Sequence, residues 1–226
     1  MIALALDTAT SSTVVGLQLP DETVREARDD VEPGQRPRHT SRLLPLAAGL
    51  LDAAGLRWHD LELIAVGLGP GTFTGLRIGI ATARGLAAAT GAPLVGVGTL
   101  RALAAAAAGG GRPVLGVIDA RRGEVFVGGY DDGRELIGPV AVAPAGVADL
   151  VAGRDWLAVG DGALRFRAVL EGGGMIVAPE RSPLHQVGSA AILRLAVAGD
   201  VDARGPVLPT YVRLPDAELA VRSGQP

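Results

Sequence analysis

Residues 67–79 read GLGPGTFTGLRIG, and the first half of the chain is arranged around them. The apolar run LELIAV at 61–66 leads into this stretch, and an alanine-rich segment that ends near Ala89 follows it. This order predicts a strand, a turn and a helix. Glycine allows a positive φ and the close approach of another backbone, and the free N–H groups of a helix N-terminus can hold an anion. The stretch is therefore a candidate phosphate-binding turn.

The same stretch departs from both common phosphate-binding signatures. A P-loop requires Gly-Lys-Ser/Thr, whereas Gly75 is followed by Leu76 and Arg77. The dinucleotide fingerprint requires a third glycine where Thr74 stands. Composition alone favours the plainer interpretation, a turn whose small residues let the helix pack closely on the sheet.

Composition describes a globular protein of one or two domains. The chain has 226 residues, 48% apolar and 3% aromatic, with a net charge of −3, and all 21 basic residues are arginine. No basic stripe suggests that this chain binds nucleic acid alone. Zero cysteines exclude disulfides, thiolate zinc sites and a cysteine nucleophile. The start lacks a basic leader, and Pro93 and Arg101 interrupt the most apolar region, so we expect no signal peptide or membrane span and a cytoplasmic location.

The first half predicts an α/β unit. Expected strands cover 2–6, 13–19, 23–27, 61–68 and 94–97, and expected helices cover 40–54, 76–89 and 99–108. Thr40 or Ser41 is the expected N-cap of the first helix, and Gly55 its terminator. Leucines cover a wide arc of this first helix, and in the second one Gly79 with Ala83, and Ala81 with Gly85, place small residues four apart. Such spacing lets another helix approach closely, either within the chain or from a partner.

The second half repeats the first. Predicted strands at 114–118 and 125–130 enclose a turn after Asp119, and an offset of 112 residues places Asp7 on Asp119, Val15 on Val127 and Gly16 on Gly128. A strand at 156–159, a turn at 160–162 and helices at 163–170 and 188–198 follow. Two such halves describe an actin-like ATPase architecture of the ribonuclease H-like class, in which nucleotide lies between the halves. We expect halves at 1–111 and 112–213, the last helix being a candidate to cross back, and a flexible tail at 214–226.

Six motifs together resemble the TsaB (YeaZ) family of bacterial tRNA threonylcarbamoyladenosine biosynthesis. They are LDTAT at 6–10, His39 with LLP at 43–45, GPGTFTGLRIG at 69–79, DARRGEV at 119–125, GDGA at 160–163 and PTYVR at 209–213. The long glycine motif followed by the Asp119 motif is the specific part, and the resemblance covers nearly the whole chain.

The resemblance implies a non-catalytic subunit. Such proteins pair with TsaD, the catalytic subunit that transfers threonylcarbamoyl from its adenylate to the adenosine 3′ of the anticodon, and the ATPase TsaE joins them. Proteins of this family can also form homodimers through the surface that pairs with TsaD, and the oligomeric state of this chain alone stays open. The resemblance further implies contact with tRNA only through the complex, no cofactor of its own, and ATP or ADP with Mg²⁺ only in the assembled complex.

The resemblance places two groups of residues. The partner interface falls on the helices at 40–54 and 76–89, with His39, Leu43, Leu46, Leu50, Gly79, Ala83 and Leu86, so Ala83→Arg is expected to abolish pairing while leaving the monomer folded. A vestigial nucleotide cleft comprises Asp7, Thr8, Gly69, Gly71, Thr72, Gly75, Asp119, Gly160, Asp161 and Gly162.

The sequence lacks two features that the catalytic and ATP-using members of this fold carry. TsaD binds metal through two histidines four apart, whereas His39, His59 and His185 have no such partner. ATP-using members of the fold carry glycine in the first turn where Ala9 stands. The alternative is an independent ATPase or kinase of this fold, with Asp7 and Asp119 near a magnesium-bound water.

Overall fold

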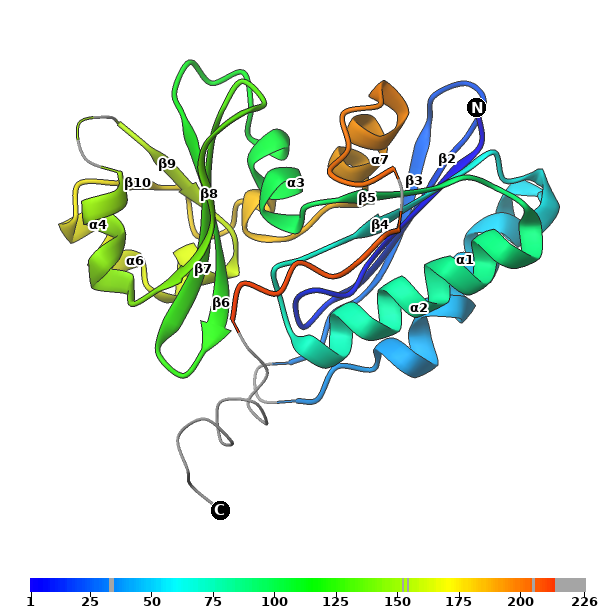
Figure 1. Ribbon diagram of the computed structural model, residues 1–226, viewed down its shortest axis with the longest axis horizontal. Helices are drawn as coiled ribbons and strands as arrows, with labels where there is room; N and C mark the ends of the chain where they lie inside the picture. The colour runs from blue at the N-terminus through cyan, green and yellow to red at the C-terminus, as the bar shows by residue number, and fades with distance from the viewer. Residues whose placement is uncertain (33–34, 152, 154, 205, 214–226) are drawn as a thin grey trace.

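The computed structural model describes residues 1–32, 35–151, 153, 155–204 and 206–213. These residues form two lobes that lie side by side, each built on a five-stranded mixed sheet (Figure 1). The strands are β1 Ala3–Asp7, β2 Thr13–Gln18, β3 Val24–Asp29, β4 Leu63–Gly67 and β5 Leu94–Val97 in one lobe, and β6 Val114–Arg121, β7 Glu124–Asp131, β8 Arg134–Val142, β9 Leu157–Val159 and β10 Ile176–Val177 in the other. The helices are α1 His39–Ala54, α2 Phe73–Thr90, α3 Thr99–Ala106, α4 Val147–Leu150, α5 Asp161–Arg165, α6 Arg167–Gly172 and α7 Ser189–Ala198, with 3₁₀ turns η1 Trp58–Asp60, η2 Pro144–Gly146 and η3 Pro183–His185.

The two sheets have the same topology. The first runs β3-β2-β1-β4-β5 and the second β8-β7-β6-β9-β10, so each opens with an antiparallel meander and continues with parallel strands. The predicted duplicated α/β fold is therefore confirmed. The constant offset of 112 is wrong in the returning strand, because Val15 pairs with Leu6 whereas Val127 pairs with Val117. The second hairpin is one residue shorter, so Phe126 is the true counterpart of Val15.

Strands β1, β2 and β4 are buried throughout because helices cover both faces of their sheet. Leu4 and Leu6 lie on one face in a cluster with residues of α1 and α2, such as Leu43 and Ile80. The opposite face carries small residues, among them Ala3 and Ala5, in a cluster that includes residues of α3 and α7. A sheet covered on both faces reads as a continuous apolar run, which is the pattern of these three strands.

Several predicted boundaries are corrected. Helix α1 begins at His39 with Arg38 as its N-cap and no side-chain cap, because the Ser41 hydroxyl donates to the Arg38 carbonyl inside the first turn. Helix α2 begins at Phe73, three residues before the predicted start. The predicted helix at 163–170 is divided at Phe166 into α5 and α6, and neither β8 nor α4 was anticipated. The predicted tail at 214–226 lies outside the described residues. Within the described ranges, no helix is long and apolar enough to cross a membrane.

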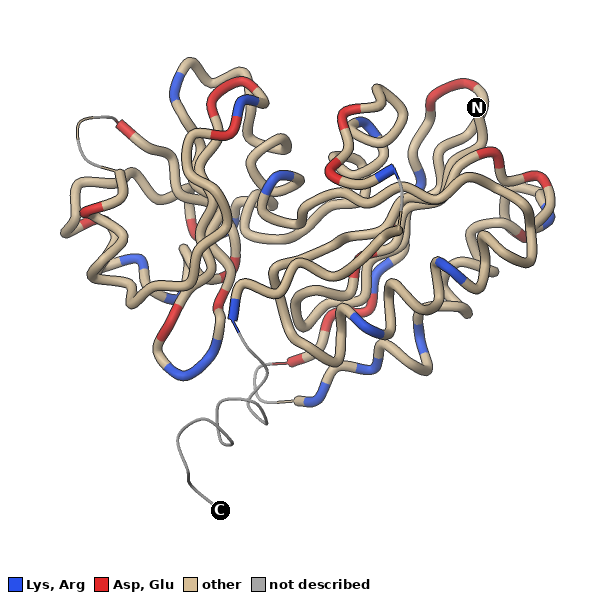
Figure 2. Tube along the Cα trace, viewed as in Figure 1, with Lys and Arg blue, Asp and Glu red and all other residues tan. Residues whose placement is uncertain are grey.

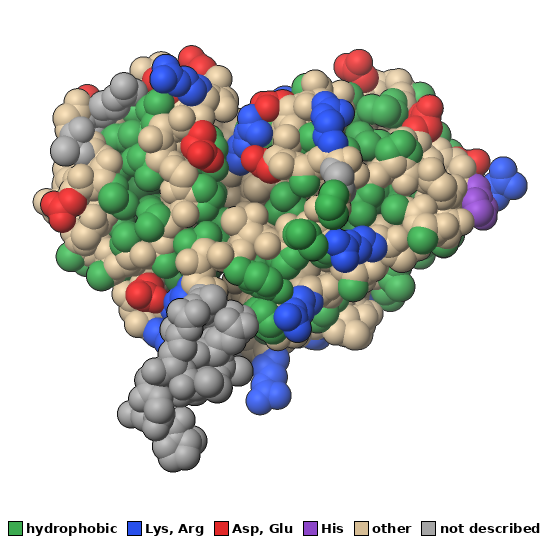
Figure 3. All heavy atoms as spheres, in the orientation of Figure 1, with side chains coloured by type: hydrophobic (Ala, Val, Ile, Leu, Met, Phe, Trp, Pro, Cys, Tyr) green, Lys and Arg blue, Asp and Glu red, His purple; other side chains and the backbone are tan. Residues whose placement is uncertain are grey.

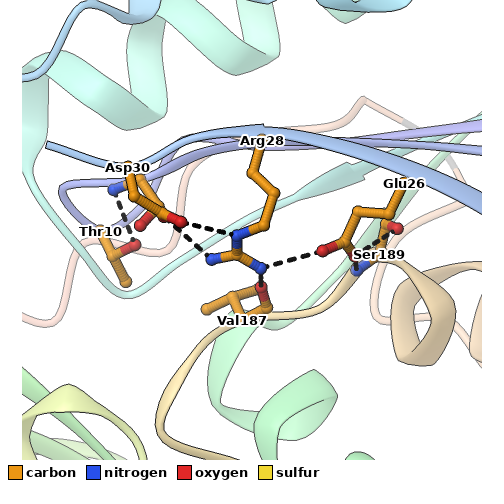
Figure 4. Close-up of polar contacts among 7 residues, drawn as sticks. Thr10, Glu26, Arg28, Asp30, Val187 and Ser189 are labelled. Carbon is orange, nitrogen blue, oxygen red and sulfur yellow. Dashed lines mark hydrogen bonds and ion pairs between the residues drawn. The ribbon is translucent and has the colours of Figure 1, made fainter. Parts of the chain in front are cut away.

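Helix α7 follows the second sheet in sequence but packs on β1, β2, β4 and β5 of the first. A polar clamp holds its N-terminal end to β3 (Figure 4). The Glu26 carboxylate accepts hydrogen bonds from the backbone N–H and the hydroxyl of Ser189, each at 2.7 Å. Arg28, paired with Glu26 and Asp30, donates to the Val187 carbonyl at 3.1 Å. An anionic side chain thus takes the place of a local cap at the helix N-terminus.

We expect Glu26→Ala to lower the free energy of unfolding by about 2 kcal/mol, since it removes two hydrogen bonds to a charged acceptor and a favourable charge at a helix N-terminus. Glu32→Ala is the matched control, because Glu32 is exposed and its side chain makes no hydrogen bond or ion pair with the described residues. Urea unfolding measures both variants. Equal stability of the two variants would contradict a stabilising role for the clamp.

Candidate functional site

The glycine motif packs against the first hairpin turn of its own chain. A Cβ on Gly71 would lie 2.2 Å from the Ala9 carbonyl oxygen, and one on Gly75 would lie 2.1 Å from that of Thr8. The Thr72 N–H donates to the Ala9 carbonyl at 2.8 Å, and the Thr8 hydroxyl donates to the Gly75 carbonyl at 2.7 Å. The absence of side chains at these glycines therefore lets the backbone of Thr8 and Ala9 pack directly against the start of α2. The plainer interpretation of the motif, close packing of helix on sheet, describes this geometry.

The carboxylate of Asp7 is hydrogen-bonded inside the same packed region of the first lobe. Its carboxylate accepts from the Ala9 N–H at 2.8 Å and from the Thr99 hydroxyl at 2.9 Å, and that hydroxyl in turn accepts from the Gly69 N–H at 3.1 Å. Gly67 leaves room for it, since a Cβ there would lie 1.9 Å from the carboxylate. Burial raises the pKa of Asp7 to about 6. The side chain therefore joins the ends of β1 and β4 and the start of α3.

The second glycine turn repeats this packing in the other lobe. Gly160 has φ 104°, and a Cβ on it would lie 2.1 Å from the Val117 carbonyl oxygen. Gly162 is also closely packed, since a Cβ on it would lie 2.8 Å from the Ile118 carbonyl carbon. The Asp161 carboxylate accepts from the Asp119 N–H at 3.1 Å, and burial raises the pKa of Asp161. These residues fix the start of α5 on β6.

A cavity of about 430 Å³ lies where the start of α2 faces the β6–β7 turn. Its lining comprises 70–74, 119–122, Phe126 and 210–213. Tyr211 stacks on Phe73 with ring centroids 5.2 Å apart, and the Arg77 guanidinium lies 3.8 Å from the Phe73 centroid while donating to the Tyr211 hydroxyl. Arg213 then reaches the second lobe, where it pairs with Glu124 at 2.6 Å. Residues 206–213 thus form a strap between the lobes (Figure 1, red).

The motif PTYVR at 209–213, which supplies the strap, was not predicted to be part of a site. The signal that could have indicated a site was Tyr211 with Arg213 near the C-terminal end of a chain with only 3% aromatic residues. The glycine motif carries another of these few aromatic residues, Phe73. Only the fold brings these three residues together.

A second cavity of about 490 Å³ lies between the lobes at the first hairpin turn. Thr10, Ser11 and Ser12 line it together with Asp161 and residues of the segment 180–187. Asp119 lines the first cavity, Asp161 lines this one, and Asp7 lines neither. The structure therefore does not bring Asp7 and Asp119 to one cavity, and their approach to a magnesium-bound water remains a prediction. No group of three or more His, Asp or Glu in the described ranges is arranged to hold a metal ion.

Most residues predicted at the partner interface face the core. His39, Leu43, Leu50, Gly79 and Ala83 are buried, and Leu46 and Leu86 are partly exposed. His39 hydrogen-bonds the Thr13 hydroxyl at 2.9 Å, and Gly79 packs on Thr8. Because Ala83 is 0% exposed, Ala83→Arg would overpack the core, and the expectation that it leaves the monomer folded is wrong.

The outward faces of α1 and α2 carry a different set. Ala81, Gly85 and Ala88 form an exposed stripe of small residues on α2, and Leu44 and Gly49 are exposed on α1. Of the two small pairs in α2, the one at 79 and 83 is therefore used inside the lobe and the other lies on the surface. The two helices pack together along one side of the lobe (Figure 1).

Comparison with known proteins shows which protein family this chain resembles. The family model of TsaD, tRNA N6-adenosine threonylcarbamoyltransferase, matches residues 32–163. The tRNA threonylcarbamoyladenosine biosynthesis protein TsaB of Escherichia coli strain K12 is 42% identical over 132 residues, which are 58% of this chain and 55% of that protein. The chain thus aligns with about half the length of the curated TsaB relatives it matches.

Solved structures extend the match over both lobes. YeaZ from Pseudomonas aeruginosa is 30% identical, with a TM-score of 0.76 over 93% of this chain and 99% of that one. A ROK hexokinase from Thermus thermophilus, 17% identical with a TM-score of 0.52 over 87% of this chain and 100% of that one, shares the actin-like fold alone. The chain has two lobes of this topology and matches both the family model and the YeaZ structure. It therefore belongs to the TsaB (YeaZ) family of tRNA threonylcarbamoyladenosine biosynthesis.

Proposed function

We propose that this chain is a non-catalytic subunit that pairs with TsaD, the threonylcarbamoyltransferase, and activates it, with TsaE as a third component. The observation that carries the proposal is the exposed face of α1 and α2, with Ala81, Gly85 and Ala88 along its centre. Helices that present small residues allow a partner helix to approach closely, and such a face buries apolar area on both sides. The same face would serve a homodimer of the protein alone.

The interior of the site supports a role without chemistry of its own. The carboxylate of Asp7 accepts two hydrogen bonds in the core, and the turn that wraps a phosphate in ATP-using relatives of the fold is packed on α2 through the Ala9 carbonyl. We therefore propose no cofactor for this chain, and binding of ATP or ADP with Mg²⁺ only in the assembled complex.

The distribution of charged residues supports the proposal that this chain contacts tRNA only through the complex. Acidic and basic residues are interspersed over both lobes (Figure 2), and the net charge is −3. Binding along a nucleic-acid backbone requires an extended basic patch or stripe, so the catalytic partner is the proposed tRNA-binding component.

We expect Gly85→Arg to abolish the complex with TsaD of the same organism, measured by size-exclusion chromatography with light scattering. Nothing lies within 4 Å of a Cβ on Gly85, so the monomer should fold, while a long cation in the stripe blocks close helix approach. Gly172→Arg is the matched control, because Gly172 is exposed at the end of α6 with the same open surroundings. It should pair like the wild type.

Two results would contradict the proposal at different levels. An intact complex with Gly85→Arg would place the interface elsewhere on the chain. No complex of the wild-type chain under any condition, together with ATP turnover by the chain alone, would favour the independent ATPase or kinase.

A further inference from the structure

A third cavity, of about 380 Å³, lies among α3, the start of β6, the β7–β8 turn and α7. None of the residues discussed as partner interface or nucleotide cleft lines it. Its apolar wall includes Ala104, Val114 and Leu195, all buried. Figure 3 shows a notch between the lobes at the upper edge of the molecule, bordered by basic and acidic side chains.

Three arginines from separate segments line this one cavity. Arg101 comes from α3, Arg112 from the segment before β6, and Arg194 from α7. Among the described residues of the lining, Asp132 carries the one carboxylate. Arg101 is ion-paired with Asp200 and Asp202, whereas Arg112 and Arg194 form no ion pair with the described residues. The excess positive charge of the lining therefore comes from Arg112 and Arg194, and two like charges without a partner are unfavourable.

The three guanidinium groups retain hydrogen-bond donors. The terminal nitrogens of Arg101 pair with Asp200 and Asp202, but its buried Nε has no partner among the described residues. Arg194 donates one N–H to the Ala105 carbonyl at the end of α3, out of the five that a guanidinium carries. Arg112 is exposed and makes no hydrogen bond or ion pair with the described part of the chain.

Tyr130 adds a neutral polar group to the wall. Its side chain is buried, and burial together with the nearby charge of Glu135 raises the pKa of the phenol. The phenol therefore stays protonated across the physiological range, and its hydroxyl is available as a donor.

We propose that this cavity binds a small molecule with an oxyanion group, either a carboxylate or a phosphate. Its apolar part would pack against the wall formed by α3 and α7. Guanidinium groups bind both oxyanions in a bidentate manner, and the cavity volume lies in the range of small-molecule sites. The site is separate from the α1–α2 face, so its test is independent of pairing with TsaD.

The test is an NMR titration of the full chain with three probes: benzoate, phenyl phosphate and inorganic phosphate. We expect saturable shifts of the Gly109 and Gly133 amides, which border the cavity. The preferred phenyl compound should bind about tenfold more tightly than inorganic phosphate, because the ring is removed from water. The order of benzoate and phenyl phosphate distinguishes a carboxylate from a phosphate ligand.

Arg112→Gln should weaken binding about tenfold, since it removes a charged donor. Arg36→Gln is the matched control, because Arg36 is exposed, makes no hydrogen bond or ion pair with the described residues and is not among the residues that line this cavity. Ala108→Phe adds a ring at an exposed residue of the lining and should abolish binding by occupying the cavity. Absence of saturable shifts with every probe, or the same affinity in Arg112→Gln as in the wild type, would overturn the proposal. Inorganic phosphate binding as tightly as both phenyl compounds would likewise overturn it.

Discussion

Replacing Gly75 with alanine is expected to lower the free energy of unfolding by about 3 kcal/mol, whereas the same change at Gly85 should raise it by about 1 kcal/mol. Both glycines lie in α2, so alanine improves helix propensity equally at the two positions. At Gly75 the added methyl would lie 2.1 Å from the Thr8 carbonyl oxygen and 2.5 Å from the Thr72 hydroxyl. The first of these is backbone, which cannot turn aside, so α2 must separate from the hairpin.

Chemical denaturation of the two variants and the wild type measures the difference. Gly85→Ala is the control, since a Cβ there meets nothing within 4 Å. If Gly75→Ala were as stable as Gly85→Ala, the hairpin turn would not be packed on the start of α2. The glycine motif would then be open, as a phosphate-binding turn requires.

The second large effect is a pH dependence carried by Asp7. Burial raises the pKa of this carboxyl from 3.8 to about 6 in the folded chain. Between these two values the folded state binds more protons than the unfolded state, so the stability that Asp7 contributes is full below pH 3.8 and is lost as pH rises through 6. The loss corresponds to about 3 kcal/mol.

Asp7→Asn removes this titration. We therefore expect the stability of the variant relative to the wild type to increase by about 2 kcal/mol between pH 4 and pH 7, measured by urea unfolding at both values. Burial also raises the pKa of Asp161, with the same sign, but that contribution is present in both proteins and cancels in the comparison. A constant difference between the two proteins across this range would show that Asp7 does not titrate as a buried carboxyl.

The order and type of most elements followed from the sequence alone. Apolar runs such as 114–118, the glycines at 55 and 91 that end α1 and α2, and the recurrence of a strand, an aspartate and a returning strand are local signals. They predicted the duplicated α/β fold because each depends on residues within a few positions of one another. Strand β8 was missed because its residues are mostly partly exposed and lack a clear apolar alternation.

Tertiary structure decided which face each helix residue uses. Gly79 with Ala83, and Ala81 with Gly85, have the same spacing, and periodicity cannot tell a face buried in its own lobe from one left open for a partner. The fold turns the first pair onto Thr8 and the core and the second pair outward. For the same reason the sequence determined that residues 67–79 form a strand-to-helix turn. Only the three-dimensional packing decided that the backbone of Thr8, 67 residues before Gly75, fills this turn together with that of Ala9.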